Sequence, residues 1–485
     1  MAQEDKVYFE AVLQSESGQS MFAPQTFLDT DTLKRYAPAA GRAAQAATEL
    51  QKLGFRVRHI GTYSISAEGP KDLWEQVFGT KVQQKRQPVS TAHPQLGERP
   101  YWFHIPNTPF TLPGALQGLV ERAYPQMPPL FFESPLPPRV PYHHLRVPDD
   151  VATVLRAHEV HKQGVTGKGV LVAMPDSGFY RHPFYDWHGY HYKRTLSPDA
   201  QFLERDELGH GTAEAANIFA SAPDIDFVGV KMGGNATLAF KTASDLYPNV
   251  MTNSWGYDLC GVATLPNFLK PLEAAVVEAV RVRGIVVCFS AGNGHTGFPA
   301  MMPDVIAVGG VYAYENLAGE DFQLEASNYA SSFDSLIYPG RHVPDVCGLV
   351  GMLPRAVYIM LPVEPGDIID TGLAGSPYPN KDETAPDDGW AVISGTSAAS
   401  PQIAGVCALI KQVQPGLPPA LVKAILRASA RDVKVGQSNI TCGQSQPAGE
   451  GHDGATGAGL VDATVAYELA RSVTPRELFA LPPPR

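Results

Sequence analysis

Short apolar runs separated by amphipathic stretches fill residues 1–80. Alternation of apolar and charged side chains, as where Phe55, Val57 and His59 are separated by arginines, predicts strands with one solvated face. Helical apolar spacing that stops at Gly54 or Gly79 predicts helices. We expect strands at residues 7–13, 55–59 and 63–66, and helices at 39–53 and 70–78. The pattern therefore predicts a small α+β domain over residues 1–123.

The pattern changes after a proline-rich stretch at residues 124–148. Because proline has no backbone N–H to donate, this stretch is expected to be an extended linker. From residue 149 to 485, apolar strands alternate with helices, which favours a doubly wound parallel sheet with helices on both faces. Strands are expected at residues 170–174, 227–230, 286–289 and 305–308, and a long helix at 265–283.

Composition and charge exclude several classes of partner. Apolar residues make up 44% and charged residues 18% of the 485 residues, as in a globular protein. The formal net charge of -11 provides no basic field, so we expect no nucleic acid and no anionic membrane surface as partner. The chain has no uninterrupted apolar run of about 18 residues, so no membrane span is predicted.

The N-terminal residues and the cysteines both favour a reducing compartment. Residues 1–10 have neither the basic start nor the apolar run of a secretory signal, so we expect a cytoplasmic protein. Signal-independent secretion is the other route left open. The five cysteines are odd in number, lie far apart and include no C-x-x-C pair, so all five are expected to be reduced.

Four polar residues stand where buried elements meet turns of small residues. Asp176 ends an apolar strand and is followed by Ser-Gly, whereas His210 lies between two glycines before a helical stretch. Asn293 follows a second apolar strand, and Ser397 begins a helix that is apolar on nearly all sides. The N-terminus of such a buried helix favours an oxyanion through its free N–H groups and its dipole.

Each of these residues has an ordinary structural interpretation when taken alone. Such Asp, Asn and Ser residues are commonly turn residues or helix caps, and a loop His is commonly a surface residue. Together they supply a nucleophile, its base, a carboxylate that orients the base, and an oxyanion donor. We therefore predict acyl transfer on Ser397, with His210 as general base and acid, Asp176 orienting it, and Asn293 in the oxyanion hole.

These residues lie in motifs that resemble those of the subtilisin family of serine peptidases. The motifs are Asp-Ser-Gly at 176, Gly-His-Gly-Thr at 209, Ala-Gly-Asn at 291 and Gly-Thr-Ser-Ala-Ala-Ser-Pro at 395. The resemblance covers residues 150–470 and implies a subtilisin-like fold and a serine endopeptidase acting on protein or peptide substrates. It further implies substrate-binding residues at Ser254, Trp255, Gly256, Ala291, Gly292 and Gly297.

The N-terminal domain resembles a different group, through residues 50–55 and 73–80. These stretches are similar to the pro-region of the sedolisin (kumamolisin-like) peptidases. The resemblance implies a ferredoxin-like pro-domain that acts as an intramolecular chaperone and inhibitor, and that is released by cutting in the linker. The chain's own N-terminal domain is thus an expected partner of its peptidase domain.

Three other functions remain open at this point. A sedolisin-like acid peptidase would use a Glu base and would have an acidic residue in place of Asn293, so the presence of His210 and Asn293 disfavours it. An inactive or permanently inhibited subtilase scaffold would bind peptides through the same cleft. A peptide ligase would use the same acyl-enzyme, and only its products would identify it.

The predicted chemistry requires no cofactor, and no metal site is predicted. His158 and His161 lack the i,i+4 spacing of a helical zinc pair. The resemblance to subtilisins leaves a structural Ca²⁺ ion as an expectation, without assigned ligands.

Overall fold

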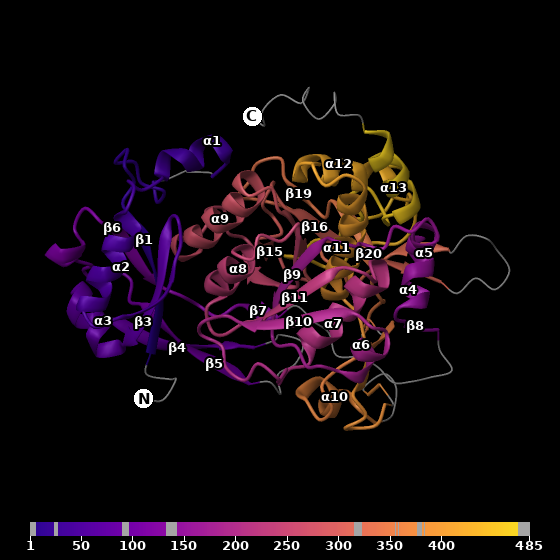
Figure 1. The fold of residues 1–485 in the computed structure, drawn as a ribbon, viewed down its shortest axis with the longest axis horizontal. Coiled ribbons are helices and arrows are strands. Elements are labelled where there is room, and N and C mark those ends of the chain that lie inside the picture. Colours follow the sequence, from indigo (N-terminus) through magenta and orange to yellow (C-terminus); the bar gives the residue numbers. More distant parts are fainter. Residues whose placement is uncertain are drawn as a thin grey trace.

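The computed structural model describes residues 6–23, 28–89, 97–131, 143–314, 323–354, 356, 358–375, 381–382 and 384–473. Within these residues the buried apolar side chains form two hydrophobic cores. The smaller core lies within residues 7–123, and the larger one fills most of the remaining structure. Figure 1 shows the corresponding N-terminal module in indigo and purple beside the larger domain.

The N-terminal module is a four-stranded antiparallel sheet on which two helices pack. Its elements are β1 (Lys6–Leu13), α2 (Arg42–Lys52), β2 (Arg56–Ile60), β3 (Ser64–Pro70), α3 (Lys71–Phe78) and β6 (Val120–Pro125). The strand order β2-β3-β1-β6 with this β-α-β-β-α-β sequence is the ferredoxin-like arrangement. A hairpin of β4 (Val82–Pro88) and β5 (Glu98–His104) is inserted before β6.

Local sequence explains why these elements form where they do. Gly54 and Gly79 follow α2 and α3 with φ of 97° and 55°, left-handed conformations that glycine adopts at little cost. The ring of Phe9 packs against Trp74 and Phe78, with centroids 4.8 and 6.0 Å away. The predicted strands and helices of this region are confirmed, with bounds that differ by a few residues.

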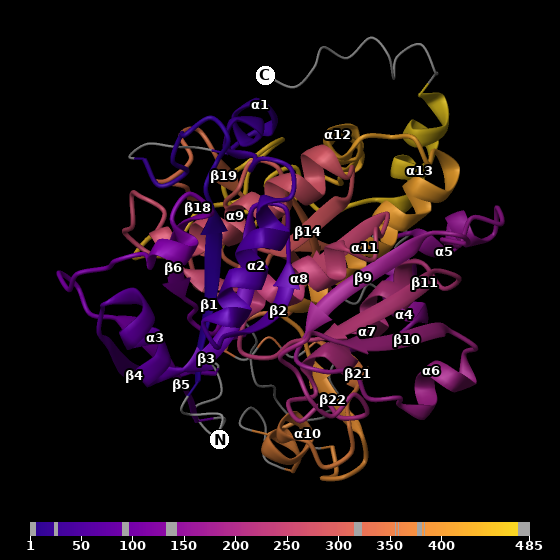
Figure 2. The same ribbon diagram turned by 60° about the vertical axis from the view of Figure 1, so that its left-hand side comes forward.

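The larger domain is built on an eight-stranded, mainly parallel sheet (Figures 1 and 2). Its strands are β9 (Leu171–Asp176), β10 (His191–Leu196), β11 (Asp226–Lys231), β12 (Val250–Asn253), β14 (Val286–Ser290), β16 (Ile306–Ala313), β17 (Leu324–Ala326) and β20 (Val346–Leu349). The order is β10-β11-β9-β12-β14-β16, and β16 also pairs with antiparallel β17 and parallel β20. The order reverses between β9 and β12, and sites in such sheets gather at the C-terminal strand ends beside this reversal. Asp176 ends β9.

Helices cover both faces of this sheet. On one face, α7 (His210–Ser221) and α11 (Thr396–Val413) pack against each other and against the strands. On the other face, α8 (Ala236–Ser244) and α9 (Lys270–Val277) lie between the sheet and the N-terminal module (Figure 1). The expected doubly wound α/β architecture is therefore confirmed.

The proline-rich stretch differs from the expected linker. It begins inside β6 and contains β7 (Leu130–Phe131) and β8 (Leu145–Arg146). These short strands form because each has a partner, β13 (Trp255–Asp258) for β7 and β21 (Ile359–Pro362) for β8. Residues 132–142, with Pro135, Pro137, Pro138 and Pro141, lie outside the described part of the chain.

The long helix expected at residues 265–283 is divided in the structure. A 3-10 turn (Asn267–Leu269) precedes α9, and a π turn (Glu278–Val282) follows it before Gly284. The other helical elements are α1 (Thr30–Leu33), Lys34–Tyr36, Gly114–Leu116, α4 (Asp149–Val154), α5 (Ala157–His161), α6 (Pro183–Trp187), α10 (Ile368–Leu373), α12 (Pro419–Ser429) and α13 (Ala463–Ser472). The other strands are β15 (Gly297–Phe298), β18 (Phe333–Asp334), β19 (His342–Val343) and β22 (Trp390–Ile393). None of the described helices combines the length and apolar character needed to cross a membrane.

The expectation that all five cysteines are reduced is wrong for one pair. Cys260 and Cys442, which are 182 residues apart in the sequence, form a disulfide with their Cα atoms 5.4 Å apart. Two surface loops bring them together, a proximity that sequence spacing does not reveal. The remaining three, Cys288, Cys347 and Cys407, are free and buried.

Candidate active site

Asp176 and His210 form a buried hydrogen-bonded pair. Asp176 is the last residue of β9, and His210 is the first residue of α7. The imidazole Nδ1 lies 2.7 Å from Asp176 Oδ1, and both side chains are 0% exposed. Because a carboxylate accepts, Nδ1 carries the proton in this contact, which directs the basic Nε2 to the opposite edge of the ring.

A second carboxyl group ties the turn after β9 to the start of α7. Asp206 Oδ1 accepts a hydrogen bond from Ser177 Oγ at 2.8 Å, and its Oδ2 accepts from the backbone N of Thr212 at 2.8 Å. Ser177 Oγ in turn accepts from the N–H of Gly211 at 3.0 Å. Burial raises the pKa of Asp206, although these hydrogen bonds oppose the effect. Sequence reasoning missed Asp206, whose only signature was an acidic residue four positions before the histidine.

Gly209 allows the side chain of Asp367 to pack closely against the backbone just before His210. Its φ of 93° is left-handed, and a Cβ added there would lie 2.1 Å from Asp367 Oδ2. Burial raises the pKa of Asp367 to about 9, and the charges of Asp206 and Asp370 act in the same direction. Asp367 is therefore protonated and uncharged at neutral pH, so it fills the space beside Gly209 without adding a full charge there.

Ser397 lies in the first turn of the buried helix α11. Its hydroxyl is 3.5 Å from the main-chain O of Ser254, and its own main-chain O accepts from Ser254 Oγ at 2.8 Å. The first-turn position puts the hydroxyl beside the positive end of the helix dipole. The structure thus connects Ser397 directly to one of the predicted substrate-binding residues.

Helices α7 and α11 run side by side in the same direction. Asn217 Oδ1 accepts from Gln402 Nε2 at 3.1 Å, and one turn further a Cβ on Gly405 would lie 2.5 Å from a side chain in the last turn of α7. The second contact lies toward the C-terminal end of both helices relative to the first, so the two helices are parallel. The first turns, which carry His210 and Ser397, therefore lie at the same end of the helix pair.

Asn293 is fixed at the start of α11 by Thr396. Its Oδ1 accepts from the backbone N of Thr396 at 3.0 Å and from Thr396 Oγ1 at 3.1 Å. With the carbonyl side of the amide committed in this way, the NH₂ group is the side that can donate to a developing oxyanion. Thr396 also binds the N–H of Gly292 through Oγ1 at 3.1 Å. Its anchoring role is a second feature that sequence reasoning missed.

The predicted substrate-binding residues lie around this helix start. Ser254 precedes β13, which pairs with β15 so that Asp258 lies opposite Gly297. A Cβ on Gly297 would lie 2.9 Å from the main-chain O of Ala291, so the two predicted pocket segments touch. The peptide bond between Phe298 and Pro299, directly after Gly297, is cis.

The side chain of Trp255 has a supporting position. Its indole is 0% exposed and donates through Nε1 to the main-chain O of Pro175 at 3.0 Å. The backbone of β13 pairs with β7 in antiparallel register. Trp255 lies opposite Phe131, and Gly256 lies opposite Leu130. The chain's own β7 therefore pairs with two of the predicted substrate-binding residues, Trp255 and Gly256.

Metal ligands are not gathered at this site. Across the described residues, no group of three or more His, Cys, Asp or Glu side chains is arranged to hold a metal ion. The structural Ca²⁺ ion stays a prediction without assigned ligands.

Comparison with known proteins defines the class. The model of the subtilase family matches residues 167–445, which is more than half of the chain, so the chain belongs to the subtilase family. Its relatives include serine protease AprX from Bacillus subtilis (strain 168), 30% identical over 329 residues that cover 60% of this chain and 68% of AprX. Subtilisin Savinase from Lederbergia lenta is 26% identical over 298 residues, covering 59% of this chain and 91% of that protein.

A solved structure agrees at the level of the fold. Fervidolysin from Fervidobacterium pennivorans, described as a keratinolytic enzyme related to subtilisin, superimposes with a TM-score of 0.55 at 16% identity. The match covers 96% of this chain and 61% of fervidolysin, so this chain spans about three fifths of that longer protein. The predictions of a subtilisin-like fold and of a serine-type endopeptidase are thereby confirmed.

Proposed function

We propose that this subtilase hydrolyses peptide bonds through an acyl-enzyme on Ser397. The observation that carries the proposal is the buried 2.7 Å contact between His210 and Asp176, on a helix that begins beside the helix of Ser397. Hydrogen bonding of Nδ1 to Asp176 leaves Nε2 to take the proton from the serine hydroxyl. The same nitrogen then returns the proton to the leaving amine.

The oxyanion of the tetrahedral intermediate would be bound at the start of α11. Asn293 supplies an amide N–H whose orientation is supported by its two hydrogen bonds from Thr396. The backbone N–H of Ser397 is the second donor, and the helix dipole favours the developing charge. These donors are fixed before the reaction, so no reorganisation is needed when the charge appears.

Pairing of β7 with β13 supports an extended polypeptide as substrate. A strand added to a free sheet edge is bound through main-chain hydrogen bonds, which are common to all peptides. Side-chain selectivity would then depend on the predicted substrate-binding residues around it, among them Gly292 and Gly297. We propose protein or peptide substrates in general, bound in the register that β7 adopts.

We propose that the N-terminal module inhibits the peptidase domain and assists its folding. The module ends with β6, and β7 follows after four residues on the proposed substrate strand. As long as β7 remains there, another peptide cannot pair with the same edge of β13. A cut in the segment between β7 and β8 would separate the module from the peptidase domain.

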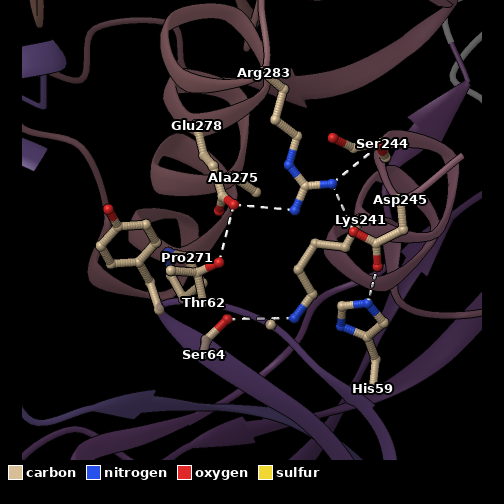
Figure 3. A pocket seen from close by; sticks show the side chains of 12 residues that line it. His59, Thr62, Ser64, Lys241, Ser244, Asp245, Pro271, Ala275, Glu278 and Arg283 are labelled. Atoms are coloured by element: carbon tan, nitrogen blue, oxygen red, sulfur yellow. Dashed lines mark hydrogen bonds and ion pairs between the residues drawn. The ribbon is translucent and has the colours of Figure 1, made fainter. Parts of the chain in front are cut away.

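The contact between the two domains supports this role. Figure 3 shows a small pocket in which His59 and Thr62 of the module face α8, α9 and the residues after them. His59 bonds to Asp245, and Thr62 Oγ1 donates to Glu278 at 3.0 Å. Arg283 Nη1 also donates to Asp245 at 2.7 Å, so charged residues are shared across the interface. Such specific contacts hold the module over α8 and α9.

Labelling with a fluorophosphonate tests the proposal, because this reagent reacts only with an activated serine. We expect the label on Ser397, and Ser397→Ala should abolish both labelling and peptide hydrolysis while the fold is retained. Ser400→Ala is the matched control, because Ser400 lies on the same helix with its hydroxyl 2.9 Å from Thr252 Oγ1. Equal loss in both variants would contradict the assignment.

Two further measurements separate the alternatives. Activity that falls as pH drops below neutrality agrees with a histidine base, whereas an acid optimum would favour a sedolisin-like mechanism. Labelling of the intact chain before and after loss of the N-terminal module distinguishes a releasable inhibitor from a permanently inhibited scaffold.

A further inference from the structure

Helix α7 carries a second carboxyl group beside the imidazole of His210. Glu214 follows His210 by one helical turn, and its Oε1 lies 3.9 Å from the imidazole Nε2. The side chain is 1% exposed, on a helix whose twelve residues are all buried. Residues four apart lie on the same helix face, so this proximity follows from the helix itself.

Hydrogen bonds hold the Glu214 carboxyl group in this position. Its Oε2 accepts from Asn217 Nδ2 at 3.0 Å, and Asn217 Oδ1 accepts from Gln402 Nε2 at 3.1 Å. Gln402 Oε1 accepts from the backbone N of Leu349 at 2.7 Å. The chain of bonds joins α7, α11 and β20. Acidic side chains are rarely fully buried, because removing a carboxyl group from water costs free energy. A buried carboxyl group that is held in place by a chain of hydrogen bonds therefore calls for a functional explanation.

We propose that Glu214 is a positioning residue that, together with Asp176, flanks the imidazolium formed at His210 during peptide hydrolysis. The inference rests on the proposed function of Ser397. When the serine hydroxyl transfers its proton to Nε2, positive charge develops on a ring with one carboxyl group at each edge. An opposite charge within about 4–6 Å favours the charged form of a titrating group. At 3.9 Å, Glu214 acts on this charge while Nε2 exchanges its proton with the serine.

Other titratable groups of this region remain constant in the test. They are Asp176 on β9, which contacts the ring, Asp206 and Tyr185, which bond to Thr212 of α7, Asp367, which packs against Gly209, and Tyr192. Burial raises the pKa of both tyrosines well above the ordinary value, so they are neutral. The charged residues of the other elements packed on α7 are Asp149 and Asp150 of α4, Asp226 and Lys231 of β11, and Lys411 of α11.

Glu214→Gln tests the proposal, because the amide keeps the shape and can still accept from Asn217. Removing the negative charge lowers the pKa of the imidazole. We therefore expect the acid limb of kcat/KM to move to lower pH by about one unit or more. The plateau rate at alkaline pH should fall about tenfold, because the imidazolium in the transition state loses one carboxylate. The pH dependence of fluorophosphonate labelling of Ser397 in the full chain should shift in the same direction.

Two comparisons separate this role from a structural one. Glu273→Gln is the matched control, because Glu273 is a 0% exposed carboxyl whose contacts are Lys270 at 3.1 Å and Tyr338 at 2.7 Å. It should leave the acid limb unchanged. Glu214→Asp keeps the negative charge. Its acid limb should therefore lie closer to that of the native chain than the acid limb of Glu214→Gln does. Should Glu214→Gln fail to fold, Glu214→Met removes the same charge with an apolar side chain of similar length.

The outcomes are distinct. An acid limb within about 0.3 units of the native value in a folded Glu214→Gln or Glu214→Met chain overturns the proposal, since a carboxylate at this distance is expected to shift it more. If the native chain does not label at Ser397, the proposed function fails. Titration of the His210 imidazole by NMR in the native and Glu214→Gln chains would then still decide the role of Glu214, and equal midpoints would overturn it.

Discussion

The carboxylate of Glu10 and the ammonium group of Lys241 form an ion pair between the N-terminal module and α8, with Oε2 and Nζ 2.9 Å apart. Glu10 is 0% exposed, and Ser64 Oγ donates to the same oxygen at 2.7 Å. Burial alone would raise the pKa of Glu10, but Lys241 and the serine hydroxyls outweigh it and hold the pKa below its ordinary value. The two domains are thus joined by a buried charge pair in addition to apolar contacts.

Replacing one partner of this pair should loosen the N-terminal module. Lys241→Met leaves the buried carboxylate of Glu10 unpaired, a change that costs about 3–5 kcal/mol when such a pair is fully buried. We expect a lower melting temperature and faster fluorophosphonate labelling of Ser397 in the intact chain. The double variant Glu10→Leu with Lys241→Met removes both charges and should recover much of the stability. Unchanged labelling in Lys241→Met would argue against inhibition by the module.

Acid should weaken the same interface. The pKa values of Glu10 and Asp245 lie below their ordinary 4.5 and 3.8, the latter because burial is outweighed by His59 and Arg283. Their stabilising effect is complete above the ordinary values, and it is lost as pH falls through the lowered folded values. Hydrogen exchange of a Ser397→Ala chain should therefore report stable module contacts at neutral pH and opening only in acid. In Glu10→Gln the acid dependence should be smaller.

Loss of the Asn293 amide should reduce turnover without preventing binding. Asn293→Leu removes the donor to the oxyanion, and we expect kcat to fall by about 10²–10³, a magnitude that comes from subtilisin itself and is carried over here. KM should change little, because the oxyanion exists only in the transition state. Thr396→Val, which removes the hydroxyl that contacts Asn293 Oδ1, should give a smaller loss. Near-normal turnover in Asn293→Leu would show that Asn293 does not stabilise the oxyanion.

The close contact of α7 and α11 should be sensitive to one methyl group. A Cβ on Gly405 would lie 2.5 Å from Ser221 Cβ and 2.7 Å from Ile218 O, so Gly405→Ala must push the helices apart. Because His210 and Ser397 lie on these two helices, kcat should fall together with stability. Gly416→Ala is the control, since a Cβ there meets nothing within 4 Å. Equal behaviour of the two variants would show that the helix spacing does not matter.

Most of the parallel sheet could be predicted from the sequence, because its central strands are buried on both faces and read as continuous apolar runs. β10 (His191–Leu196) did not stand out, since this edge strand mixes polar and apolar residues. β12 (Val250–Asn253) was missed because it has only four residues, of which only Val250 and Met251 are apolar. Pairing with β9 and β14 makes it a strand.

The four chemical residues of the candidate site could be predicted because each lies in a short motif with glycines or small residues beside it. Their supporting residues could not be predicted in the same way. Asp206 and Thr396 act through contacts between segments distant in the sequence, which no local pattern encodes. Glu214 did have a local signature, because it follows His210 by one turn and is the only acidic residue of α7.

The disulfide also bears on where the protein resides. Cytoplasmic residence stays a proposal, and a Cys260–Cys442 bond is more typical of an oxidising compartment. Trapping of free thiols in fractionated cells measures the redox state of this pair directly. A fully reduced pair in the cytoplasmic fraction would support that location.

The Cys260–Cys442 bond closes a covalent ring that contains Asn293 and Ser397 but excludes His210, Asp176 and the whole N-terminal module. A backbone cut anywhere inside the ring leaves both fragments attached, so the nicked protein keeps its full mass until a reductant is added. A cut between β7 and β8 falls outside the ring, so the module separates on a denaturing gel even without reductant. Electrophoresis with and without reductant therefore distinguishes maturation from internal damage in a single comparison.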